Sequence, residues 1–519
     1  MTSTRHSPTV TLRLDTLVSH CDPAWVAFFA SLALSAMAIY RMDDPNRDGM
    51  LYLQTAELFK SGGVAAARSS FDWVFFPVLI GLVSKFSGLS SEVSGYAISA
   101  LLLAGVCATL VRITVSQFGG NVAWSACLVA LSLPAFNHYR DFLIREFGFW
   151  LFCLLAILAA LRWVKRPTWG GGLTIQACIA LASLFRLEAI AFYAALALWQ
   201  LAVPQEWRQR VRHLLMLLGL PISGGLLLAG MVATHSLDIS ERIEHYTAAV
   251  NPATALARFR LSAQQFAAAA LNHYSEREAS SILFFGLFSM IPKKFVLMSG
   301  AFIIPLVWFF RTGSLRQKIA AWQPAGWFFA VYVIVLTAFT TFSLFLSGRY
   351  VSFLNILSVP LIAVGLCDLL DRLSRWRYVL IGIALLIALA NVVSFAPETT
   401  QFRAAGRWLA EHAQLAPRTY IGSPRSGYYA GAAYRAIWNS GMAPESIAQA
   451  VHDRRFEYYV LELDRRDAKE GDWIRSLNLT EVERFAGKTG DTVLILRQES
   501  EGLGRIDTRV PNAPSDAGK

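Results

Sequence analysis

Long apolar runs separated by short bursts of basic residues are the feature that most constrains the fold of this chain. A transmembrane helix needs about 20 mostly apolar residues. The 519-residue chain is 55% hydrophobic and only 16% charged. A soluble protein of this composition would expose large apolar patches to water. The sequence therefore predicts an all-α polytopic membrane protein.

Eleven windows of the sequence are predicted to cross the membrane. Nine contain no charged residue, and two shorter windows suffice if flanking Trp163 or Arg311 reaches outward. The eleven are residues 23–40, 93–111, 113–139, 147–161, 167–185, 189–205, 214–237, 295–310, 319–348, 350–367 and 378–397. Two further apolar runs, 73–84 and 279–292, are short and are expected to lie at the interface or to re-enter it.

Basic residues indicate which side of the membrane each loop faces. With the N-terminus in the cytoplasm, four of the five inner loops hold three basic residues each, as the positive-inside rule requires. The net charge of +11 thus reflects membrane topology, and no nucleic-acid partner is expected. The outer side receives residues 41–92, 138–146, 185–188, 236–294, 347–350 and everything after 396.

The C-terminal part of the chain differs in pattern. Residues 399–413 have helical periodicity, and 455–464 and 491–498 are typical of short strands. We expect a cytoplasmic segment (1–22), a transmembrane domain (23–397), a small periplasmic α/β domain (398–499) and a disordered tail (500–519). The predicted location is a bacterial inner membrane.

Three aspartates follow the first predicted span, in the stretch YRMDDPNRDGMLYLQTAELF (40–59). Tyr52 stands four residues after Asp48, within one helical stripe, so an amphipathic helix on the outer leaflet is predicted with Asp48 at its start. Asp48 alone suits a helix cap. Asp43 and Asp44 alone suit solvated loop charges.

A second charged cluster lies in the outer turn NHYRDFLIREFGFW (137–150). Arg145 follows Asp141 by four residues, the spacing of an ion pair on one helical turn. Glu146 has no such partner and begins an apolar span. An ionisable side chain at that depth usually faces a protein interior or a wet cavity.

Cations occur at three other outer positions. Arg186 and Glu188 bracket the turn between the fifth and sixth spans, and Arg349 enters the tenth span beside Tyr350. Each arginine could instead reach lipid headgroups.

The third cationic position is the pair Lys293 and Lys294, which follows the second short apolar run. Carboxylates can accept a proton from a nucleophile, whereas Arg and Lys can hold a phosphate. Both kinds of group at one side of the bilayer suit a substrate that is a lipid phosphate.

This ordered set resembles the GT-C class of polyprenyl-phosphate-dependent glycosyltransferases, nearest the branch of aminoarabinose transferases and protein O-mannosyltransferases. The matching stretches are DGMLYLQTAELFKSG (48–62), REFGFWL (145–151), LFRLEAIAFY (184–193) and SGRYVSFLNILSVPL (347–361). Gly49 stands where the family often has a second acid. The segment WVFFP (73–77) lacks the lysine that some branches carry before the proline.

The resemblance implies transfer of a sugar, with inversion, from a polyprenyl-phosphate donor to a hydroxyl of a saccharide, lipid or protein acceptor. Asp48 would be the general base and Glu146 a second catalytic acid. Donor phosphate contacts would come from Arg186, Arg349, Tyr350, Lys293, Lys294, Arg145 and Glu188. Acceptor or auxiliary contacts would come from Asp43, Asp44, Tyr52 and Asp141. Glu146 with Asp43 or Asp44 could bind Mg²⁺ or Mn²⁺, although aminoarabinose-type relatives need no catalytic metal.

Other functions fit parts of the pattern. A transporter or flippase of a lipid-linked saccharide is the main alternative, but it should carry ionisable groups near mid-membrane and paired broken helices. A non-catalytic scaffold has no need for Asp48. An enzyme similar to an O-antigen ligase would use the same lipid chemistry on a different module.

Overall fold

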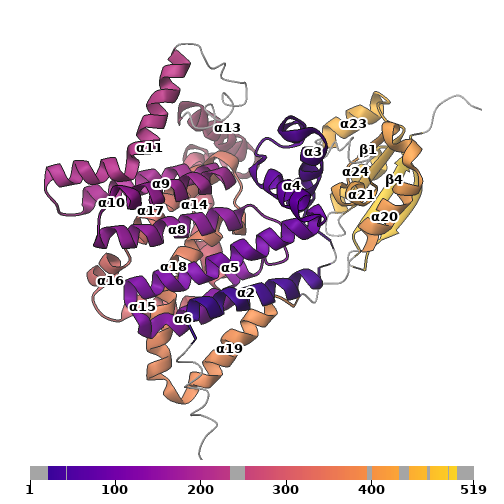
Figure 1. Ribbon diagram of the computed structural model, residues 1–519. Helices are drawn as coiled ribbons and strands as arrows, with labels where there is room; N and C mark the ends of the chain where they lie inside the picture. The colour runs from indigo at the N-terminus through magenta and orange to yellow at the C-terminus, as the bar shows by residue number, and fades with distance from the viewer. Residues whose placement is uncertain are drawn as a thin grey trace, which may run out of the picture. The chain divides into compact units, whose positions relative to one another are not determined.

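The chain forms two compact units, residues 1–394 and 395–519 (Figure 1). The computed structural model describes residues 21–42, 44–233, 252–393, 400–431, 444–463, 468–488 and 490–498. Of the predicted cytoplasmic segment, only residues 21 and 22 are described, and the predicted tail 500–519 lies outside the described residues.

Within the described residues of the first unit, six helical segments are long and apolar enough to cross a membrane. They are α2 (Pro23–Tyr40), α5 (Ser91–Phe118), α8 (Glu146–Lys165), the run His273–Arg311, α17 (Ala325–Ser343) and α18 (Gly348–Arg372). The run contains η3 (His273–Glu278), α14 (Ala279–Ser299), η4 (Gly300–Phe302) and α15 (Ile303–Arg311). The chain is therefore a multi-pass membrane protein.

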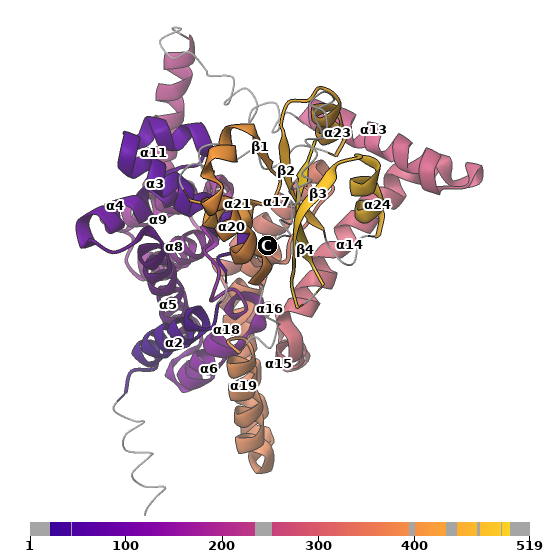
Figure 2. The ribbon, with the colours of Figure 1, turned by 90° about the vertical axis from the view of Figure 1, so that its right-hand side faces the viewer.

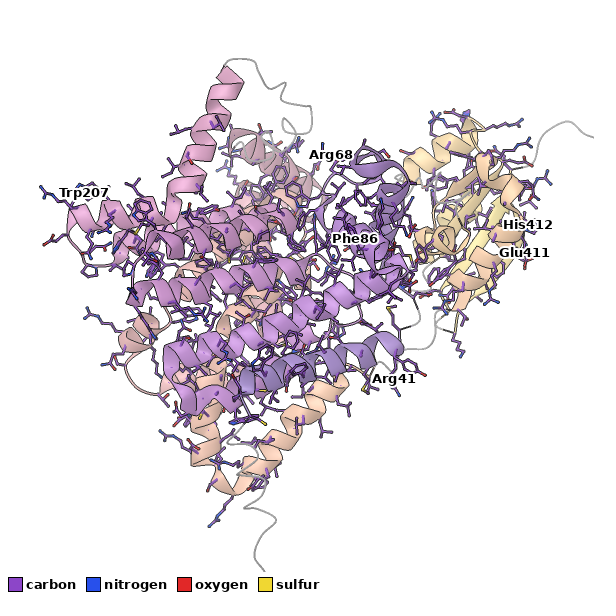
Figure 3. The ribbon with its side chains drawn as sticks, in the orientation of Figure 1. Arg41, Arg68, Phe86, Trp207, Glu411 and His412 are labelled. Atoms are coloured by element: carbon purple, nitrogen blue, oxygen red, sulfur yellow. The ribbon has the colours of Figure 1, made fainter. Side chains whose placement is uncertain are left out.

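Further helices complete the described part of this unit. They are α3 (Arg47–Ser70), α4 (Phe75–Ser87), η1 (Gly120–Val122), α6 (Ala123–Ser132), α7 (Pro134–Asn137), α9 (Trp169–Phe185), η2 (Leu187–Ile190), α10 (Ala191–Ala202), α11 (Trp207–Ala233), α13 (Pro252–Ala270), α16 (Leu315–Ala321), η5 (Ser374–Trp376) and α19 (Arg377–Ala390). Helices α2, α5, α8 and α9 pack side by side in that order (Figure 1). Arg41, just after α2, and Trp207, at the start of α11, lie at opposite ends of the helices (Figure 3).

Two predicted span boundaries are wrong. The expected loop at Arg112 lies inside α5, which continues to Phe118 and ends where Gly119 adopts a left-handed φ of 94°. The expected division between residues 279–292 and 295–310 lies inside α14, and the chain bends instead at Gly300, with a φ of 54°. In both places glycine supplies the break, because it adopts positive φ without steric cost.

Helix α18 is the central element of the first unit. It packs against α5, α6, α14, α15 and α17, and its residues 351–363 are all buried. Polar side chains fix its register, since Asn355 Nδ2 donates to Phe295 O at 2.9 Å and to Ser299 Oγ at 2.8 Å. A Cβ atom at Gly365 would collide with the carbonyl oxygen of Pro305, so glycine allows α15 and α18 to approach closely.

The second unit contains a four-stranded sheet in the order β1-β2-β4-β3 (Figure 2). Its strands are β1 (Thr419–Ile421), β2 (Tyr458–Leu463), β3 (Thr480–Ala486) and β4 (Thr492–Arg497). Its helices are α20 (Thr400–Glu411), η6 (Ala413–Arg418), α21 (Pro424–Tyr429), α23 (Pro444–His452) and α24 (Ala468–Ser476). Strand β1 is parallel to β2, and the other pairs are antiparallel. The two predicted strands contain β2 and β4.

Both faces of this sheet are covered, as the alternation along its central strands requires. Val460 of β2 packs on one face with residues of α20, including Phe402 and Leu409. Its neighbour Tyr459 packs on the other face with residues of α23 and α24, including Ile447 and Ile474. The sheet therefore has a separate apolar core on each side.

The Gly365 contact predicts a stability difference between two glycine substitutions. Gly365→Val should destabilise the membrane unit by about 1–3 kcal/mol, because the Pro305 backbone cannot yield without moving α15. Gly382→Val on α19, where an added Cβ meets nothing within 4 Å, is the matched control and should unfold like wild type. Thermal unfolding of the detergent-solubilised variants measures both. Equal unfolding temperatures would contradict the packing argument.

Candidate active site

Asp48 lies in the first turn of α3 and pairs with an arginine more than 300 positions away in the sequence. Asn46, not Asp48, is the N-cap residue of α3. Asp48 Oδ2 instead accepts a hydrogen bond from Arg349 Nη1 at 2.6 Å. Arg349 is on the first turn of α18, so this pair joins the start of α3 to the central helix.

Asn46 fixes the segment before α3 to the segment before α8. Its Oδ1 accepts from Leu143 N at 2.8 Å, and its Nδ2 donates to Leu143 O at 3.4 Å. A Cβ atom at Gly49 would lie 2.8 Å from both Leu143 Cβ and Asn46 Oδ1. The close approach of these loops therefore leaves no room for a second acidic side chain at position 49.

Arg186 binds two carboxylates in a buried cluster. Its Nη1 donates to Glu146 Oε1 at 2.7 Å, and its Nη2 donates to Glu188 Oε1 at 2.6 Å. The side chains of Arg186 and Glu146 are only 7% and 5% exposed. The guanidinium also lies 4.5 Å from the ring centroid of Tyr350, the residue after Arg349. Arg186 is thus engaged on both edges and one face.

Tyr52 shows that the two ion-pair groups belong to one site. Its ring packs against Phe71 and Phe76, with centroid distances of 5.6 and 5.5 Å. Burial raises the pKa of the Tyr52 hydroxyl, which therefore stays protonated at neutral pH. The same hydroxyl lies within electrostatic range of four charged side chains: Arg145, Glu146, Asp48 and Arg349. The structure therefore brings residues 48, 146, 186 and 349 together, as the sequence predicted.

Arg145 lies at this cluster without an ion pair to any described residue. The expected helical pair with Asp141 is absent among the described residues, because residues 138–145 form turns and irregular backbone and no helix. The Arg145 guanidinium lies 5.7 Å from the centroid of Phe71 instead. Asp141 is half-buried, and burial raises the pKa of its carboxyl group.

The two lysines lie within α14 rather than at its end. Neither forms an ion pair with a residue that the structure describes. Lys293 is exposed and Lys294 half-buried. Lys294 precedes Met298 by one helical turn, and Met298 Sδ lies 4.0 Å from Tyr139 Oη in the segment before α8. Asp44 lies in the bend before α3, and Asp43 falls outside the described residues.

Sequence reasoning missed several residues that position the site. Arg140, 1% exposed, donates at 2.9 Å to Ser31 O, Ser31 Oγ and Ser35 Oγ, which ties the segment before α8 to α2. Trp73 Nε1 donates to Leu184 O at 2.7 Å, two residues before Arg186. Arg140 could have been found in the sequence, because it directly precedes Asp141 in the second charged cluster.

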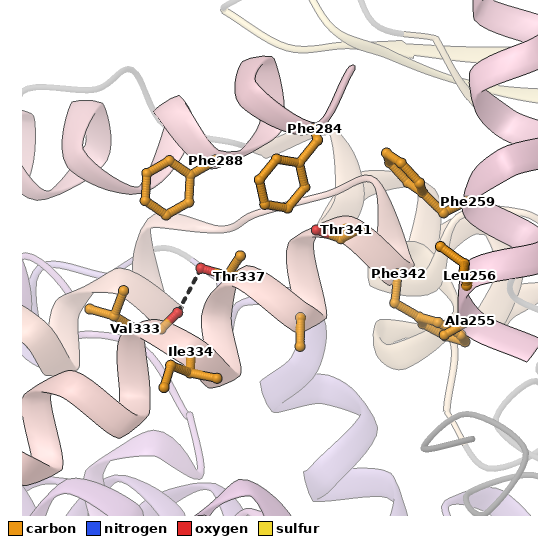
Figure 4. Close-up of a pocket in the computed structure, with 11 residues that line it drawn as sticks. Ala255, Leu256, Phe259, Phe284, Phe288, Val333, Ile334, Thr337, Thr341 and Phe342 are labelled. Carbon is orange, nitrogen blue, oxygen red and sulfur yellow. Dashed lines mark hydrogen bonds between the residues drawn. The ribbon is translucent and has the colours of Figure 1, made fainter. Parts of the chain in front are cut away.

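An apolar groove lies between α13, α14 and α17, with a volume of about 550 Å³. Phe259, Phe284 and Phe288 face Thr337 and Thr341 across it (Figure 4). The Thr337 hydroxyl does not face the groove as a free donor, because it bonds to Val333 O at 2.8 Å (Figure 4). The groove is therefore suited to a hydrocarbon chain.

A metal ion at this site would need several carboxylate, imidazole or thiolate side chains close together. Among the residues described, no three His, Cys, Asp or Glu side chains gather to hold a metal ion. Asp48 and Glu146 each accept a hydrogen bond from a guanidinium instead. The charges of the Asp48 and Glu146 carboxylates are therefore compensated by Arg349 and Arg186.

Comparison with known proteins gives the class of this fold. Residues 74–224 match the family model described as dolichyl-phosphate-mannose-protein mannosyltransferase. The fold of the whole chain is also found in solved structures of the GT-C class. The chain thus resembles the GT-C class in its fold, as the sequence resemblance indicated.

Three structures illustrate the likeness. The oligosaccharyltransferase AglB from Archaeoglobus fulgidus, with an inhibitory peptide and a dolichol-phosphate, has a TM-score of 0.52 and 12% identity, over 93% of this chain and 74% of that chain. The Archaeoglobus fulgidus oligosaccharyltransferase with Zn and sulfate has a TM-score of 0.52 and 14% identity, over 92% and 73%. ArnT from Cupriavidus metallidurans, bound to undecaprenyl phosphate, has a TM-score of 0.40 and 14% identity, over 94% and 98%. No curated protein sequence matches this chain.

The buried cluster predicts an unusual pattern of stabilities. Arg186→Met should lower the free energy of unfolding by about 3–5 kcal/mol, because it leaves the carboxylates of Glu146 and Glu188 without their shared cation. Adding Glu146→Gln and Glu188→Gln to that variant should recover most of the loss. Unfolding of the purified protein tests this. If the triple variant is less stable than the single one, the arginine does not act by neutralising these two acids.

Proposed function

We propose that the chain is an integral-membrane glycosyltransferase that moves a hexosyl or pentosyl unit from a polyprenyl-phosphate donor to an acceptor hydroxyl, with inversion at the anomeric carbon. The acceptor is a saccharide, lipid or protein. The observation that carries the proposal is the pair of Asp48 and Arg349 beside the Glu146–Arg186–Glu188 cluster. The GT-C fold of the chain supports it.

The proposal includes a topology. Eleven spans place the N-terminus in the cytoplasm, and the active site and the C-terminal α/β unit on the periplasmic side of a bacterial inner membrane. The basic inner loops support this orientation. The number of spans is supported by the shorter apolar helices, among them α9 and α10, which add to the six long ones in the first unit.

Asp48 is the proposed general base. Its side chain is 40% exposed, far more than that of Glu146, so an acceptor can reach it. The acceptor hydroxyl gives its proton to Asp48 while its oxygen attacks the anomeric carbon. The bond from that carbon to the phosphate oxygen breaks, and its electron pair leaves with polyprenyl phosphate. The phosphate passes from a diester to a monoester and gains negative charge.

Arg349 and Arg145 are the proposed contacts to that phosphate. Arg349 loses a charged partner when Asp48 takes up the proton, so its guanidinium becomes available as the leaving group gains charge. Arg145 has no carboxylate partner among the described residues and lies in the same electrostatic cluster. Lys294 and Lys293 are further candidates. Arg186, held by two acids, instead positions Glu146 and Tyr350.

The groove between α13, α14 and α17 is the proposed seat of the polyprenyl chain. Its lining is almost entirely apolar, as a hydrocarbon requires. Arg258 of α13 lies over the ring of the groove residue Phe342, at 5.6 Å, and so places a positive charge beside this groove.

Asp48→Asn should reduce transfer by about two to four orders of magnitude, the usual contribution of a general base. The shape of the site is kept, so the protein should remain folded. Asp371→Asn, near the opposite end of α18 from Arg349, is the matched control and should transfer normally. Mass spectrometry of cell-envelope glycans, with and without the gene and with each variant, identifies the unit transferred. An Asp48→Asn variant with normal glycans would exclude this base, and unchanged glycans on deletion would exclude the function.

Arg145→Gln should lower kcat/KM for the lipid-phosphate donor by about two orders of magnitude, the effect of losing one preorganised charge contact. Its unfolding temperature should fall only slightly, because Arg145 forms no direct ion pair with a described carboxylate. Arg47→Gln, an exposed arginine at the start of α3, serves as the control. Transfer assays in reconstituted vesicles give the rates. An equal loss in the control variant would indicate general surface charge instead.

A further inference from the structure

A basic groove lies at one end of the sheet in the second unit. It is lined by Pro417, Arg418, Arg454, Arg455, Phe456, Glu457 and Gln498, with a volume of about 380 Å³. The groove gathers the residue before β1, the residues before β2 and the residue after β4, so three strands contribute to it. It belongs entirely to residues 395–519 and is separate from the candidate active site.

The described residues around this groove carry more positive than negative charge. Glu457 accepts from Arg418 Nη1 at 3.4 Å and from Arg497 Nη2 at 3.0 Å, so one carboxylate serves two guanidinium groups. Arg455 pairs with Asp453 at 3.3 Å, and Arg454 adds a fourth guanidinium. Most of these arginines are largely exposed and can turn toward a ligand, as the 73% exposure of the Arg418 side chain illustrates.

Arg454 lies at the end of helix α23 in a backbone conformation that is unusual for a residue other than glycine. Its φ is 51°, in the left-handed region, where it ends helix α23. Arg455 N then donates to Ala450 O at 2.9 Å, the backbone pattern of a helix end that glycine usually supplies. A residue with a Cβ atom is strained in this conformation. Such strain is found mostly where the side chain has a function.

We propose that this groove binds an anionic phosphate ester, with Arg454, Arg455 and Arg418 as its charge contacts. Guanidinium groups suit phosphate because their planar forks give paired, charge-assisted hydrogen bonds. Phe456 offers an apolar wall for the body of the ligand. The phosphate ester belongs either to a soluble sugar phosphate or to a phospholipid headgroup. The inference does not rest on the proposed glycosyl transfer.

The test uses the full chain in zwitterionic nanodiscs, with glucose 1-phosphate as the soluble probe and calorimetry as the readout. A second arm measures retention of phosphatidylglycerol by native mass spectrometry. Arg454→Gly keeps the left-handed backbone and relieves its strain, so its unfolding temperature should equal or exceed that of wild type. The same variant should bind the probe at least tenfold more weakly, and adding Arg418→Gln should weaken binding further.

Arg484→Gln is the matched control, because Arg484 lies on β3 of the same sheet and outside the groove. It should bind like wild type. Arg145→Gln removes the anion site proposed in the first unit, so binding that survives this change belongs to the groove. A sugar phosphate bound without phosphatidylglycerol retention identifies a soluble ligand, and the reverse identifies a lipid headgroup. The proposal is overturned if neither is bound, if Arg454→Gly binds both normally, or if Arg484→Gln loses as much.

Discussion

The arrangement of the candidate site depends on keeping charged groups at the end of a membrane bundle without leaving any of them uncompensated. A buried carboxylate without a partner costs several kcal/mol, so Glu146 can begin α8 only where Arg186 meets it. Arg186 is in turn held by Glu188, two residues on. This cluster joins α8 to the turn between α9 and α10. It therefore constrains the segments that adjoin Glu146, Arg186 and Glu188.

The charges of the site balance before any substrate arrives. Three carboxylates, Asp48, Glu146 and Glu188, face three guanidinium groups, Arg145, Arg186 and Arg349. A balanced cluster can be built at low cost from the chain alone, whereas a site with surplus cations would repel itself. The groups differ in burial, however. Arg186 and Glu146 are almost inaccessible, while Asp48 is 40% exposed, so exchange of partners is confined to the Asp48–Arg349 side.

The apolar pattern of the sequence was enough to predict a helical membrane bundle, because spans are specified by local composition. The sequence also predicted that charged residues of four separate segments converge, and the structure places Asp48, Glu146, Arg186 and Arg349 close together, while their functional roles stay predictions. Their pairing was not predictable, since Asp48 and Arg349 are 301 positions apart and nothing local favours one partner over another. The local rule for Asp141 and Arg145 misled for the same reason: their segment is not a helix. The Asn46 clamp on Leu143 uses backbone groups, which leave no trace in side-chain patterns.

The shared position of Arg349 links the two halves of the proposed reaction. In the resting arrangement its guanidinium donates to the Asp48 carboxylate at 2.6 Å, so the two charges compensate each other before the acceptor arrives. Once the proton arrives, that attraction weakens, and the positive charge is left facing the site as the leaving phosphate gains charge. Proton uptake by Asp48 thus lowers the electrostatic cost of releasing the phosphate. Arg186 cannot do this, because it is held by two carboxylates, Glu146 and Glu188, and neither of them receives the acceptor proton. The division between a fixed and an exchangeable arginine therefore gives each a different function within one cluster.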